Sequence, residues 1–102
     1  MKYLGRIAGE GTLTAGGERV DSASYEIDGF LKPKIGVSGS GEIATSANAL
    51  SRVFGRRDIQ IVTVDGRHID VRFSERKMAP GARVAHVELS GALPTASADW
   101  AG

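Results

Sequence analysis

The clearest pattern in this chain is an alternation of apolar and polar residues from Asp58 to Phe73. β-Branched residues dominate the stretch and an Asp-Gly pair interrupts it, as in a β-hairpin. A two-residue loop at the Asp-Gly pair would mix polar and apolar residues on both faces of the hairpin. A three-residue loop over residues 64–66 instead pairs Ile61 with Ile69, and it gives Gly66 a left-handed conformation that side chains disfavour. We predict this second register, whose apolar face contains Ile59, Ile61, Ile69, Val71 and Phe73.

The same alternation predicts four further strands, because large apolar residues recur at odd-numbered positions. Three strands precede the hairpin and one follows it. Glycines inside the first and third strands indicate strong bending there. The predicted strands span Tyr3 to Leu13, Tyr25 to Leu31, Ile35 to Ile43, and Ala85 to Leu89.

One short helix is predicted from Ala47 to Phe54, between the third strand and the hairpin. Ser46 is a favourable N-cap and Gly55 suits the C-terminal cap. An apolar stripe at helical spacing would face the core. This stripe consists of Ala47, Leu50, Val53 and Phe54.

The order of elements predicts the fold class: a mainly β, closed antiparallel barrel of five or six strands. The 14 glycines favour closure over an open sheet, since closure removes exposed edges. The predicted order of elements, with a helix between the third and fourth strands, is similar to that of the OB-fold. With 102 residues the chain suits one domain, which we place at residues 1–91. We expect residues 92–102 to form a mobile tail.

Composition excludes several classes of protein. The 13 basic and 12 acidic residues give a net charge of +1, which provides no global attraction to nucleic acid or membranes. The absence of cysteine excludes disulfides and thiolate zinc sites. No apolar stretch approaches the roughly 20 residues of a membrane span. We expect a cytoplasmic protein without membrane contact or cofactor.

Three valines with outward parity are the favoured candidate for an interaction face: Val62, Val64 and Val84. Exposed apolar patches commonly mark protein contacts, and small domains that self-associate most often form symmetric dimers. The alternative is that the helix or Trp100 in the tail covers these residues. The favoured function is a non-catalytic protein-binding module, including self-association as a homodimer.

Single-stranded nucleic-acid binding is the second hypothesis. Residues 32–62 contain five basic and two acidic residues, which could line a groove for phosphates. Binding of single strands also requires aromatic platforms, and these are scarce because four aromatics, Tyr3 among them, have core parity. The candidate residues are Lys32, Lys34, Arg52, Arg56, Arg57 and Phe30.

A metal site or metal-dependent enzyme is the third hypothesis. His68 with Asp70, and His86 with Glu88, occur at the spacing that projects both members of a pair to one face of a strand. If the last strand pairs with the second strand of the hairpin, the four side chains could hold a divalent metal or form a general base. Solvated strand faces produce the same pattern, so we expect no catalytic or metal-binding role.

Overall fold

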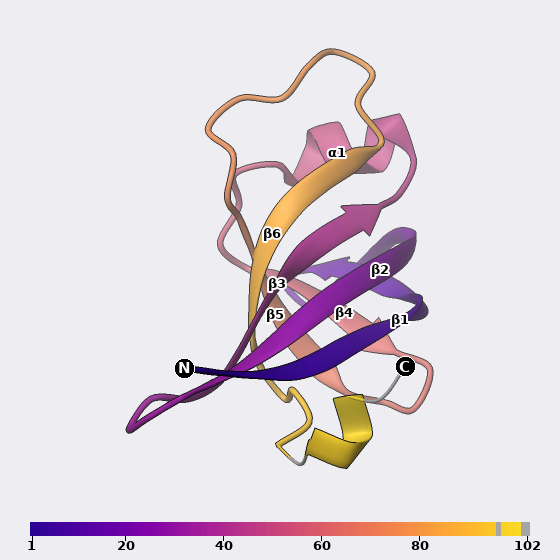
Figure 1. Cartoon of the computed structure of the whole chain (residues 1–102). Helices are drawn as coiled ribbons and strands as arrows, with labels where there is room; N and C mark the ends of the chain where they lie inside the picture. The colour runs from indigo at the N-terminus through magenta and orange to yellow at the C-terminus, as the bar shows by residue number, and fades with distance from the viewer. Residues whose placement is uncertain (96, 101–102) are drawn as a thin grey trace.

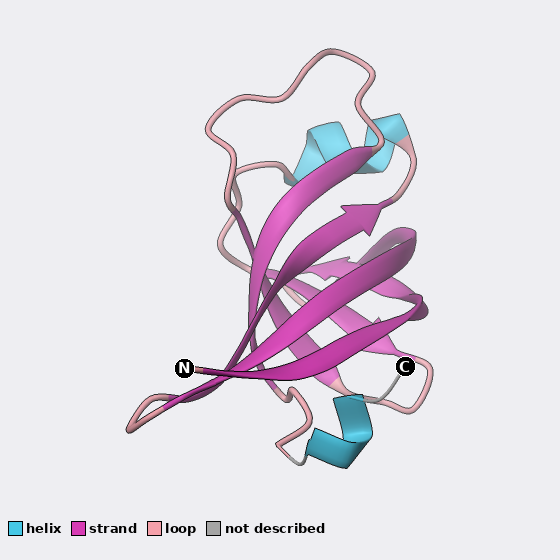
Figure 2. Ribbon diagram, viewed as in Figure 1, coloured by secondary structure: helices cyan, strands magenta, loops and turns pink. Residues whose placement is uncertain are grey.

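In the computed structural model, six antiparallel strands close into a barrel in the order β1-β2-β3-β6-β5-β4 (Figures 1 and 2). The structure describes residues 1–95 and 97–100. One short helix lies between β3 and β4, so the predicted fold class is confirmed. The elements are β1 (Lys2–Ala15), β2 (Glu18–Lys32), β3 (Gly36–Ala44), α1 (Ala47–Val53), β4 (Ile59–Thr63), β5 (His68–Phe73), β6 (Val84–Gly91) and the 3-10 helix η1 (Ser97–Trp100).

The hairpin of β4 and β5 has the predicted register. Ile61 lies opposite Ile69. The Thr63 amide donates a hydrogen bond to the Arg67 carbonyl at 2.9 Å, so residues 64–66 form the loop, and Gly66 adopts φ +88°, the left-handed conformation that favours glycine. The Thr63 hydroxyl accepts a hydrogen bond from the Arg67 amide at 3.0 Å, which closes the turn.

β1 and β2 form a longer hairpin than the sequence pattern predicted. β2 begins at Glu18, and Gly16 and Gly17 form the connection with φ of +59° and +84°. Positive φ at both central residues is the requirement of a tight type I′ turn, which keeps the strands paired up to the turn. The polar residues at the start of β2 concealed this part of the strand.

A β-bulge near Leu4 reverses the orientation of the first residues of β1. Tyr3 lies opposite Phe30 whereas Gly5 lies opposite Gly29, so one extra residue is inserted in β1. Consequently Leu4 packs against the core and Tyr3 is 56% exposed. The prediction that Tyr3 belongs to the core is therefore wrong.

The barrel interior is apolar, and α1 covers one end of it. Odd-numbered residues from all six strands are buried, as predicted, but Leu31 is 39% exposed and Ile35, which lies in the turn before β3, is 78% exposed. α1 begins after Ser46, whose hydroxyl accepts a hydrogen bond from the Ala49 amide at 3.1 Å. Ala49, Leu50 and Val53 are its buried residues, so the helix turns a slightly different face inward from the one predicted. No helix in the described part of the chain is long and apolar enough to span a membrane.

The C-terminal segment covers the other end of the barrel, below β1 and β2 in Figure 1. Trp100 is fully buried, and its indole Nε1 donates a hydrogen bond to the Pro94 carbonyl at 2.7 Å. Gly29 makes room for the ring, since a Cβ at that position would lie 2.7 Å from three ring carbons. In the described part of the tail that was expected to be mobile, Leu93 and Trp100 are buried against the barrel. Ala96 and residues 101–102 lie outside the described residues.

We predict that Trp100→Ala lowers the free energy of unfolding by about 3–5 kcal/mol, because it removes a fully buried aromatic side chain and leaves a cavity. Trp100→Phe should lower the free energy of unfolding less, because phenylalanine keeps an aromatic ring in the core and the main further loss is the hydrogen bond to the Pro94 carbonyl. Urea unfolding followed by circular dichroism measures both changes. Val64→Ala is the control, since that side chain is 90% exposed. Equal stability of Trp100→Ala and the native chain would contradict the burial.

Candidate interaction surfaces

The barrel does not bring the three candidate valines into one patch. Val62 lies opposite His68 on β5, near the level of Gly91 at the end of β6. Val84 begins β6, seven residues before Gly91, which corresponds to about 24 Å along the strand. Val64 is 90% exposed in the β4–β5 turn and Val84 is 48% exposed. Val84 therefore lies apart from Val62 and Val64, and it lines a hollow with Glu10 and Tyr25 on the outer face of the sheet.

The basic residues proposed for a nucleic-acid groove are also separated. Lys32 and Lys34 lie at the β2–β3 turn, whereas Arg52 lies on α1 at the other end of β3. The nine residues of β3 span about 30 Å. Figure 1 shows the turn and the helix at opposite ends of the molecule. The other candidates are likewise separated: Phe30 lies near the lysines, while Arg56 and Arg57 follow α1. Arg56 is paired with Asp58, with 2.5 Å between Nη2 and the carboxylate.

The histidines and carboxylates on β5 and β6 do not form a common site, although the two strands are neighbours as the metal hypothesis required. The antiparallel register places Asp70 opposite Ser90 and Glu88 opposite Arg72. His86 instead approaches Glu42 on β3, with 3.7 Å between Nδ1 and Oε1. His68 lies near Gln60 on the far side of the hairpin. Within residues 1–95 and 97–100, no three potential metal ligands come together.

The sequence pattern did not reveal a free edge on β1. β2 pairs with β1 along its whole length, but β4 pairs only with Gly11–Ala15. Within the part of the chain that the structure describes, no strand pairs with the second edge of residues 2–10. The cause is a mismatch in length: β4 has 5 residues and β1 has 14. β4 ends at the turn after Thr63, so the sheet cannot continue alongside the N-terminal half of β1.

A groove lies beside this free edge at residues 7–10. Its other walls are the β4–β5 turn, with Val64, and the C-terminal segment, with Pro94 and Asp99. Partly buried Ile7 and Tyr25 contribute apolar lining. We call this feature the β1 groove. Its position beside unpaired backbone makes it the best-formed candidate for binding an extended chain.

Charges around the β1 groove are mainly negative. Asp65 is paired with Arg67, with 3.2 Å between the carboxylate and Nε, and the remaining charged residues, Glu10 and Asp99, are both acidic. Burial, followed by the charge of Asp65, raises the pKa of the Tyr25 hydroxyl, so the hydroxyl is protonated and able to donate. The groove therefore favours a partner that carries basic and apolar side chains.

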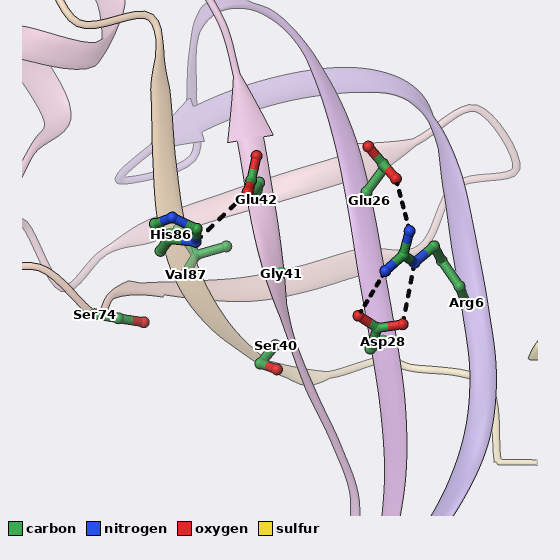
Figure 3. Close-up of a pocket in the computed structure, with 9 residues that line it drawn as sticks. All are labelled: Arg6, Glu26, Asp28, Ser40, Gly41, Glu42, Ser74, His86 and Val87. Atoms are coloured by element: carbon green, nitrogen blue, oxygen red, sulfur yellow. Dashed lines mark hydrogen bonds and ion pairs between the residues drawn. The ribbon is translucent and has the colours of Figure 1, made fainter.

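A second, more polar pocket lies on the outer surface of β1, β2, β3 and β6 (Figure 3). Arg6 is held there between two carboxylates, with Nε 3.1 Å from Asp28 and Nη1 3.2 Å from Glu26. The Tyr3 hydroxyl also donates to Asp28, at 2.9 Å. His86 faces Glu42 across the pocket. The charged side chains of this pocket are thus paired with one another, and these contacts do not indicate a catalytic group.

Comparisons with known proteins returned no match: no family model, curated protein or solved structure is similar to this chain.

We predict a titration midpoint below the ordinary value of 3.8 for the Asp28 carboxyl, because hydrogen bonds from Arg6 and then Tyr3 stabilise its charged form and lower its pKa. This contribution to stability is present above the ordinary pKa and is lost as pH falls through the lowered one. Carbon NMR measures the midpoint. Arg6→Gln should return the Asp28 midpoint toward 3.8. Asp28→Asn should destabilise the protein at neutral pH but not at a pH below the lowered pKa, where the carboxyl is already protonated. A midpoint at or above 3.8 in the native chain would contradict the ion pair.

Proposed function

We propose that this barrel is a non-catalytic protein-binding module that accepts an extended segment of a partner chain on the free edge of β1. The observation that carries the proposal is the unequal pairing of β1, which leaves one edge of residues 7–10 beside an open groove. A sheet edge presents a row of backbone donors and acceptors that another strand can satisfy. Addition of a strand to such an edge is a recurrent mode of peptide recognition.

The side chains around the edge support specificity for a particular kind of segment. Alternate side chains of an added strand would point toward Ile7, Tyr25 and Val64, so apolar residues fit at every second position. The intervening positions would face the acidic side chains of Glu10 and Asp99, where lysine or arginine is favoured. The partner we propose is therefore an extended segment of alternating apolar and basic residues.

This assignment keeps one of the three valines that the sequence pattern singled out. Val64 lines the β1 groove, at 90% exposure, whereas Val84 lies outside it and lines an adjoining hollow with Glu10 and Tyr25. Such a large exposed apolar side chain beside unpaired backbone is consistent with a contact residue that becomes buried on binding. The matched pair Val64→Asp and Val84→Asp therefore separates the β1 groove from a general apolar attraction.

We predict that selection from a displayed random peptide library enriches extended peptides with alternating apolar and basic residues. Synthetic versions of the enriched peptides, measured by fluorescence anisotropy, should bind Val64→Asp about tenfold more weakly or worse, a loss of about 1.4 kcal/mol. Val84→Asp should bind like the native chain. A proline in the centre of the peptide should also weaken binding, since it removes a backbone donor.

Absence of enriched peptides, or equal losses for the two valine variants, would overturn the proposal. Sedimentation equilibrium of the free protein tests whether a second copy of the barrel occupies this edge instead. A dimer that Val64→Lys dissociates would assign the β1 groove to pairing between two copies of the barrel, and not to a partner peptide.

A further inference from the structure

A projection at one end of the barrel carries both apolar and basic residues. The β2–β3 turn and the start of β1 extend beyond the closed part of the sheet, at the lower left of Figure 1. Lys2 pairs there with Leu31, and the turn is closed by a hydrogen bond from the Ile35 amide to the Lys32 carbonyl at 3.2 Å. We call this projection, residues 1–3 and 30–36, the tip.

Large apolar side chains at the tip are exposed to solvent. Ile35 is 78% exposed at the turn and Leu31 is 39% exposed behind it. Tyr3 and Phe30 pack against each other on the projection, with ring centroids 5.5 Å apart and ring planes tilted by 56°. Exposed apolar side chains that gather on a projecting turn are costly in water, and such clusters commonly mark contact sites.

The charge at the tip is entirely positive. Lys2, Lys32 and Lys34 surround the apolar residues. Residues 1–5 and 29–41 contain no aspartate or glutamate. The neighbouring carboxylate, Asp28, is already bound by Arg6 and Tyr3. The net charge of +1 therefore conceals a local basic site at the tip.

We propose that the tip docks the barrel on the surface of an anionic lipid bilayer. Ile35 and Leu31 would enter the boundary between headgroups and acyl chains, while the three lysines contact anionic headgroups. A projecting turn suits a flat surface, whereas single-stranded nucleic acid requires a groove with open aromatic faces. This inference revises the expectation of no membrane contact, which considered net charge and membrane-spanning segments.

The tip and the β1 groove are separate surfaces. The tip uses the first residues of β1, and the β1 groove begins at Ile7. The lipid contact therefore goes beyond the proposed protein binding, and each can be tested without the other.

Vesicle flotation of the full chain tests the inference, with vesicles of phosphatidylcholine alone or mixed with phosphatidylserine. We expect binding to the mixed vesicles at low salt, loss at high salt, and little binding to phosphatidylcholine. The double variant Lys32→Gln and Lys34→Gln should bind about 25-fold more weakly, because each lysine near an anionic surface contributes roughly fivefold. Its control is Arg76→Gln with Lys77→Gln, an equal charge change in the exposed β5–β6 loop that lies near α1 (Figure 1).

Fluorescence of I35W gives a second readout that does not depend on charge. The introduced indole should shift to shorter wavelength on mixed vesicles, whereas the native chain should not respond, because Trp100 is already buried. Equal binding by the lysine variant and its control, or no shift for I35W, would overturn the proposal. Tip-dependent binding of a mixed-sequence single-stranded DNA in place of vesicles would likewise overturn it and assign the tip to nucleic acid.

Discussion

Closure of the barrel depends on five residue pairs between β1 and β4, at Gly11–Ala15. This short contact joins the first strand to the fourth and allows all six strands to enclose one apolar interior. Because β4 ends soon after the contact, β2 is the only described strand that pairs with the N-terminal half of β1, which η1 also contacts. The interaction that completes the core therefore also creates the free edge and the β1 groove.

The two open ends of the barrel are covered by segments of different kinds. α1 buries Leu50 and Val53 at one end, and the C-terminal segment buries Trp100 at the other. Glycine determines where the indole can lie, because any side chain at Gly29 would collide with it. The same segment provides Pro94 for one wall of the β1 groove. Stability and the proposed binding surface thus share the last described residues of the chain.

Local patterns predicted the elements well, since parity alone identifies the inward residues of a strand. The hairpin register followed from the same rule, with Gly66 at the required left-handed position. Parity failed at Tyr3, because a bulge depends on the partner strand and leaves no mark in the alternation. The contact of Trp100 with Gly29 could not be predicted, because a single tryptophan in a polar segment does not indicate a distant partner.

Candidate surfaces were harder to predict, because they depend on which strands are neighbours and at what level they pair. His68 and His86 lie on adjacent strands, yet the register keeps them apart.

The most direct test of the closure is amide hydrogen exchange along β1, measured by NMR. In an antiparallel sheet, alternate amides of a strand face opposite neighbours. Protection should therefore be continuous over Gly11–Ala15, where β1 has two neighbours, and should alternate between slow and fast over residues 7–10, where one edge is free. Uniformly slow exchange at residues 7–10 would show that the edge is already occupied. Fast exchange at Gly11–Ala15 would show that the barrel is not closed there.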